Sequence, residues 1–102
     1  MDFASFHQSL TDSQPPAGLH PLLRAMWYDG RGDWDSSHDI AQDIPGKWGS
    51  WVHAYLHRKE GDEWNAGYWY RQAGRPFPHL SLEAEWEEIV QQLLGQYPVQ
   101  SS

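Results

Sequence analysis

Hydrophobic positions recur at helical spacing from one end of the chain to the other. Phe3, Phe6 and Leu10 fall at i, i+3 and i+7, which predicts a short helix within residues 2–13. The last segment places its apolar residues on one helical face. These residues are Leu82, Trp86, Ile89, Val90, Leu93 and Tyr97. Because no stretch alternates apolar and polar residues as a strand would, the pattern predicts an all-α fold.

Glycine, proline and capping residues divide the middle of the chain into helices. "PLLRAMWYDG" begins at Pro21, which suits a first helical turn, and "DWDSSHDIAQDI" ends at Pro45. "WGSWVHAYLHRKE" ends before Gly61, and Asp62 can cap "EWNAGYWYRQAG". We therefore expect about five helices.

A chain of 102 residues has the size of one small domain, so we expect a single helical domain over residues 1–102. Its expected parts are an N-terminal segment, two antiparallel helical hairpins in tandem and a capping helix. They cover residues 1–18, 19–46, 47–78 and 79–97.

A weak internal repeat relates the two expected hairpins. A shift of 29 residues places Ala25 on Ala54 and Gly32-Asp33 on Gly61-Asp62. Tandem hairpins explain such a match, because a single hairpin cannot bury its hydrophobic face alone.

The second hairpin resembles a tetratricopeptide (TPR) repeat or its Sel1-like relative, whose pattern is W-x2-L-G-x2-Y, then A-x3-F, then P. The residues that carry the match are Ala54, Gly61-Asp62, Ala66, Tyr70 and Pro78. His53 and His57 depart from the pattern, because they stand where the repeat has Leu and Tyr. The resemblance covers about residues 20–78. The chain is also similar to small bacterial proteins with a WVHAYLHRKEGD-type segment, a resemblance that implies no activity.

The tetratricopeptide resemblance implies a scaffold that binds a protein or peptide partner, with a second copy of the chain as one candidate. By the same resemblance, Asn65 could bond a bound peptide backbone, whereas as a helix-start residue it could simply cap. Tyr68, Trp69 and Tyr70 cannot all face inward at helical spacing. Trp69 is therefore a candidate ligand contact, and its alternative is packing on a neighbouring hairpin or in a dimer.

Composition and charge narrow the classes of partner. Asp and Glu number 14 against 7 Lys and Arg, and the resulting formal net charge of -7 argues against nucleic-acid binding. No apolar run approaches the roughly 18 residues of a membrane span, and "MDFASFHQSL" lacks the features of a signal peptide. The chain has no Cys, which excludes thiolate metal sites and fits a reducing compartment. We expect a cytoplasmic protein that binds neither nucleic acid nor a membrane.

His53 and His57 lie four residues apart, so both project from one helix face, at a spacing that can chelate a metal. The zinc-protease motif His-Glu-x-x-His is absent, because Ala54 follows the first histidine. Glu60 lies one turn further, and His38 could reach the same groove from the preceding helix. His38, His53, His57 and Glu60 thus form an alternative site for a divalent transition metal such as zinc. In the competing interpretation no metal binds, and the imidazoles belong to a polar core.

Arg24 is the first-hairpin counterpart of His53. If both point inward, the groove between the hairpins carries Arg24, Tyr28, His53 and His57, which would suit a carboxylate or phosphate ligand. Alternatively, Arg24 forms an ion pair with one of the many carboxylates.

The sequence favours a small helical-repeat interaction module whose partner it does not identify. The alternative is a metal- or small-ligand-binding helical protein with a His-lined site around His53 and His57. With no Cys and no Ser in a Gly-x-Ser-x-Gly setting, we expect no catalytic nucleophile. Whether the protein is an enzyme stays open, and the expectation leans towards none.

Overall fold

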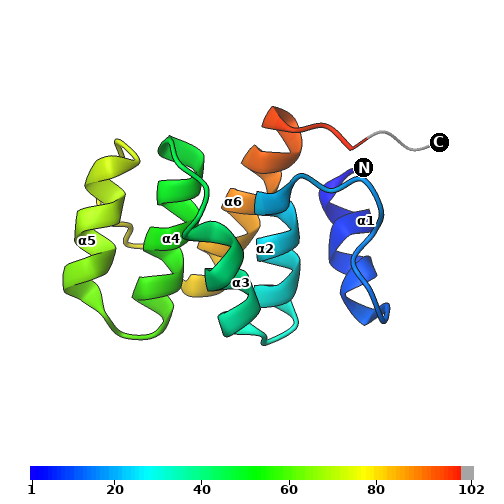
Figure 1. Ribbon diagram of the computed structural model, residues 1–102, viewed down its shortest axis with the longest axis horizontal. Helices are drawn as coiled ribbons and strands as arrows, with labels where there is room; N and C mark the ends of the chain where they lie inside the picture. The colour runs from blue at the N-terminus through cyan, green and yellow to red at the C-terminus, as the bar shows by residue number, and fades with distance from the viewer. Residues whose placement is uncertain (100–102) are drawn as a thin grey trace.

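Six α-helices and one short 3-10 helix form the structure, a computed structural model that describes residues 1–99 (Figure 1). No strand occurs in these residues, which confirms the all-α class. Residues 1–99 contain six α-helices where about five were expected, and α1 lies within the segment 2–13 for which the hydrophobic spacing predicts a helix. The bounds are α1 (Phe3–Gln8), η1 (Ser9–Thr11), α2 (Pro21–Gly30), α3 (Trp34–Ala41), α4 (Lys47–Lys59), α5 (Glu63–Gln72) and α6 (Leu82–Gln96). The end of the expected domain, residues 100–102, lies outside the described part.

Capping side chains set where the helices begin. The carboxylate of Asp33 accepts the backbone N–H of Ser36 at 3.1 Å, and that of Asp62 accepts the N–H of Asn65 at 3.3 Å. Pro21 is the first residue of α2. Asp33 and Asp62 occupy helix starts because their carboxylates accept a backbone N–H that the helix leaves free. Pro21 suits the same place because it has no backbone N–H to satisfy.

The turns after α2 and α4 have the same geometry. In Gly32-Asp33 the glycine φ is +84° and the aspartate N–H donates to the Tyr28 carbonyl at 2.9 Å. In Gly61-Asp62 the glycine φ is +87° and the aspartate N–H donates to the His57 carbonyl at 2.9 Å. This bond is typical of a Schellman motif, which needs a residue that tolerates the left-handed region. The two turns fold α3 back on α2 and α5 back on α4, so these helices pack in pairs.

The helices stand side by side, with α5 at one end of the molecule and α1 at the other (Figure 1). Between them, α4 contacts α2, α3, α5 and α6, and α6 also contacts α1 and α2. The overall dimensions are 40 × 25 × 24 Å. No helix within residues 1–99 is long and apolar enough to cross a membrane.

One buried carboxylate, that of Glu85, satisfies polar atoms of two aromatic core residues. Glu85 of α6 is 2 % exposed and accepts hydrogen bonds from the Tyr70 hydroxyl at 2.6 Å and Trp51 Nε1 at 3.2 Å. It also pairs with Arg58 at 2.8 Å. Burial and the Glu85 carboxylate raise the pKa of Tyr70, so its hydroxyl remains a donor. Trp51 and Tyr70 can lie in this core because their N–H and O–H groups have a charged acceptor.

Candidate metal centre

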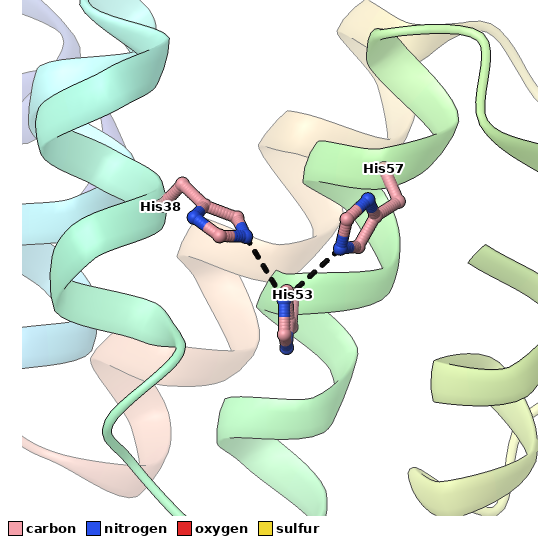
Figure 2. Close-up of side chains that lie close together, drawn as sticks. All are labelled: His38, His53 and His57. Carbon is pink, nitrogen blue, oxygen red and sulfur yellow. Dashed lines mark hydrogen bonds between the residues drawn. The ribbon is translucent and has the colours of Figure 1, made fainter. Parts of the chain in front are cut away.

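Helices α3 and α4 bring three histidines together. His53 and His57 lie one turn apart on α4, and His38 of α3 faces them across the contact between the two helix pairs (Figure 2). Nε2 of His53 lies 3.1 Å from Nε2 of His38 and 3.1 Å from Nε2 of His57. One ring nitrogen from each residue lies within 4.8 Å of the other two. We call this set the tri-histidine cluster (His38, His53, His57).

Hydrogen bonds within the cluster cannot satisfy its nitrogens. A neutral imidazole nitrogen carries either one proton or one lone pair in the ring plane. Nε2 of His53 can therefore make one well-directed hydrogen bond, yet two nitrogens approach it at hydrogen-bonding distance. One cation shared by three lone pairs would satisfy all three atoms at once.

A proton is not the cation that this environment favours. His53 is only 8 % exposed. Burial, followed by the neighbouring His57 and His38, lowers the pKa of His53 from 6.5 to about 4. The ring is neutral at pH 7 as a result, and the neutral imidazole is the form that binds metals.

Two carboxylates lie beside the other nitrogen of His57. Nδ1 is 2.8 Å from Oε1 of Glu60 and 3.7 Å from Oδ2 of Asp62. A carboxylate at Nδ1 holds a proton there and leaves the Nε2 lone pair directed at the cluster. His57 also lies in the last turn of α4, where the helix dipole attracts positive charge. The surroundings of His57 therefore favour a cation at the cluster.

Two indole rings hold the imidazoles in place. Trp34 stacks on His38 with 4.8 Å between ring centroids and 11° between ring planes, and its Nε1 donates to the Leu56 carbonyl at 2.9 Å. Trp69 of α5 packs on His53 at 4.3 Å between centroids. Because packing fixes these rings, the cluster needs little rearrangement to bind a ligand.

The two nitrogen separations that involve His53 agree with a tetrahedral metal site. With zinc–nitrogen distances of about 2.0–2.1 Å, two ligands of a tetrahedron lie about 3.3 Å apart. The observed contacts are 3.1 Å. Three histidines leave the fourth tetrahedral position open, an arrangement also found in catalytic zinc sites. The same nitrogen donors suit Cu²⁺ and Ni²⁺.

Of the other site residues that the sequence analysis proposed, some lie beside the tri-histidine cluster and some do not. Trp69 packs against the cluster, and Glu60 supports His57 at Nδ1 instead of pointing at the shared Nε2 position. Arg24 is exposed on α2, and Tyr28 is half-buried. Among the contacts recorded for residues 1–99, none joins Arg24 or Tyr28 to the histidines.

Asn65 lies in the first turn of α5, where Asp62 is the capping residue. Its Nδ2 donates to Oδ2 of Asp62 at 2.6 Å, and its backbone N–H donates to Oδ1 at 3.3 Å. In both bonds Asn65 is the donor and Asp62 the acceptor, so Asn65 takes part in the helix start as the residue that is capped and not as the cap that the sequence offered as an alternative.

Sequence reasoning missed Trp34 and Asp62 as neighbours of the cluster. Trp34 precedes His38 by four residues, and this spacing on one helix is a signal that could have found the stack. Asp62 was expected only as a cap. Its approach to His57 depends on the turn at Gly61, which returns α5 towards the end of α4.

The fold and the cluster define an all-α protein with three convergent histidines between two helix pairs. Comparison with known proteins adds no relative, since no family model, no curated protein and no solved structure matches the chain. Function is therefore argued from the chemistry of the site.

Proposed function

We propose that the protein binds one divalent transition-metal ion, zinc in the first place, through Nε2 of His38, His53 and His57. The observation that carries this proposal is the approach of two Nε2 atoms to a third at 3.1 Å. Hydrogen bonds alone leave that arrangement unsatisfied, whereas a tetrahedral ion satisfies it with almost the same spacing.

The bound ion would connect the two helix pairs, because His38 belongs to α3 and the other two ligands belong to α4. Glu60 would hold His57 in the ligating tautomer, and the open position would accept water or a small anion. This makes metal binding the function that the geometry supports best.

A zinc titration against a chromophoric chelator tests the proposal. Wild type should bind one zinc per chain, and His53→Ala should weaken binding by about 100-fold or more, since it removes the central ligand. His79→Ala is the matched control, because His79 is exposed in the loop before α6 and should leave the affinity unchanged. Circular dichroism checks that each variant keeps its helices. Equal affinities in wild type and His53→Ala would reject the site.

We also propose that α2–α3 and α4–α5 are tandem tetratricopeptide-like hairpins, with α6 as the capping helix, and that the outer face of α5 binds a second copy of the chain. Trp64 on α5 is 78 % exposed, and Tyr68, one turn later, is 41 % exposed. In a repeat array the next hairpin would cover this face. Two large rings left in water at the end of such an array favour an interface.

Sedimentation over a range of protein concentrations tests this second proposal. Wild type should shift from monomer to dimer as its concentration rises, and a Trp64→Glu, Tyr68→Glu double variant should stay monomeric. Ala84→Glu, which adds one charge at an exposed position of α6, should behave as wild type. A wild type that stays monomeric at every concentration would reject the interface.

A further inference from the structure

A cleft of about 440 Å³ lies between α1, α2, α4 and α6, away from the tri-histidine cluster. Tyr55 and Lys59 of α4 line it, and they point from the helix face opposite to His53 and His57. Phe3, Leu10, Leu82 and Trp86 form its apolar lining. The volume and lining are those of a small-molecule site, which is concave and mostly apolar with a few polar groups.

An ion pair in the wall, between the partly exposed Lys59 and the buried Asp29, contributes no net charge to the cleft. Asp29 is 2 % exposed, and both of its carboxylate oxygens have partners. Oδ1 lies 3.0 Å from Nζ of Lys59, and Oδ2 accepts the Tyr55 hydroxyl at 3.0 Å. Because the carboxylate and the ammonium neutralise each other, this group does not select the charge of a ligand.

Glu83 and Glu87 give the cleft two carboxylates outside the Asp29–Lys59 pair, and His7 of α1 is the remaining titratable group in its lining. The two glutamates lie four residues apart on α6, so both project from the helix face that lines the cleft. Neither takes part in any of the ion pairs recorded for residues 1–99. An apolar cleft therefore carries two unpaired carboxylates at its edge.

Trp86 gives the cleft a rigid aromatic wall. Its Nε1 donates to the Met26 carbonyl at 3.1 Å. Its ring also lies close to Gly30, where an added Cβ would be 2.8 Å from Cζ2 of the indole. An indole held in one orientation offers a fixed apolar surface, and aromatic rings attract cations.

We propose that this cleft binds a small apolar molecule that carries one protonated amine. The apolar part would lie against Phe3, Leu82 and Trp86, and the ammonium would lie between Glu83 and Glu87. The formal net charge of -7 adds attraction for cations as they approach. A carboxylate of the same shape would meet two like charges and bind more weakly.

Two probes of similar shape and opposite charge, 2-phenylethylamine and 3-phenylpropionate, test the proposal by titration into ¹⁵N-labelled protein. The chain has seven Trp, so the indole N–H signals report on separate places, and Trp86→Phe assigns the one in the cleft. The Trp86 signal should move saturably with the amine, which should bind about tenfold tighter than the carboxylate. The signal of Trp64, on the outer face of α5, should stay in place.

Charge-neutral variants show whether the carboxylates cause this preference. A Glu83→Gln, Glu87→Gln double variant should lose most of the preference for the amine, because the substitution removes the two charges and keeps the shape of the side chains; both positions are exposed. Glu88→Gln is the control, because Glu88 pairs with Arg75 at 3.5 Å and does not line the cleft. The proposal fails if the amine does not move Trp86 at millimolar concentration, if both probes bind wild type equally, or if the double variant keeps the preference. The zinc titration is independent of each result.

Discussion

Each histidine of the tri-histidine cluster has its own role at the scale of the single residue. His53 is central and buried, His38 comes from the other helix pair, and His57 is oriented by Glu60. A ligand whose other nitrogen bonds to a carboxylate is both better oriented and more basic. Glu60 should therefore influence metal affinity without touching the metal.

Glu60→Gln is expected to weaken zinc binding by about 10- to 100-fold, because an amide holds the Nδ1 proton of His57 less firmly than a carboxylate does. Chelator competition at constant pH measures the change. Glu63→Gln, at an exposed position in the first turn of α5, is the control and should bind as wild type. If both variants bind equally well, Glu60 has no role in the site.

The low pKa of His53 predicts how stability depends on pH in the metal-free protein. The folded-state pKa is about 4 against 6.5 for the free side chain, so the unfolded chain binds more protons between these values. The free energy of unfolding should therefore rise with pH across this window. The contribution of His53, about 3 kcal/mol, should be complete above pH 6.5 and lost as pH falls towards 4.

Urea unfolding at several pH values, with a chelator present, measures this dependence. His53→Gln removes the titrating group and should flatten the curve between pH 4 and 6.5 relative to wild type. The surface carboxylates Asp2, Asp33 and Asp62 have pKa values lowered below 3.8 and are common to both proteins, so the difference isolates His53. Parallel curves would mean that His53 titrates normally.

At the scale of the element, α4 does most to organise the molecule. One face carries His53 and His57, and the opposite face carries Tyr55 and Lys59 of the cleft. The start of this helix depends on a close backbone approach, since a Cβ at Gly49 would lie 2.0 Å from the Ile44 carbonyl oxygen. No rotamer change can relieve a contact with backbone.

Gly49→Ala should therefore destabilise the fold by about 3 kcal/mol, because the loop before α4 must move. Gly95→Ala is the matched change. It lies in α6 with open space around an added Cβ, so it should be neutral or stabilise by up to about 1 kcal/mol. Thermal unfolding of the two variants beside wild type checks both effects. Equal effects would show that the approach at Gly49 is not a constraint.

Local signals in the sequence are sufficient to place most helix boundaries. Pro21, Gly61 and Asp62 act on neighbouring backbone, so their effects can be predicted without knowledge of the fold. The exposure of Arg24 could not be predicted, because it depends on how α2 rotates against its neighbours. Similarly, the partner of Asp29 lies 30 residues away on α4, and no local pattern relates the two.

At the scale of the whole molecule, the tri-histidine cluster lies at the contact between two helix pairs. His53 and His57 could be grouped from their spacing, but the distance from His38 to them is set by the packing of α3 on α4. A metal ion bound there would tie the pairs together, and ligands that bind only the folded state stabilise it.

Zinc at about 100 times its dissociation constant should add about 2.7 kcal/mol to the free energy of unfolding, which for a domain of this size corresponds to an increase of roughly 10–20 °C in Tm. His38→Ala should lose most of this increase, because the ion would then be held by α4 alone. His79→Ala should retain it. A Tm that does not respond to zinc in wild type would contradict a link between the helix pairs.

X-ray absorption at the zinc edge of the one-to-one complex tests the central claim most directly. The tri-histidine site predicts a four-coordinate ion with three imidazole nitrogens at about 2.0–2.1 Å and one further light ligand. In His53→Ala the imidazole scattering should decrease. A spectrum of six oxygen ligands, or one without imidazole scattering in wild type, would show that the three histidines do not hold the metal.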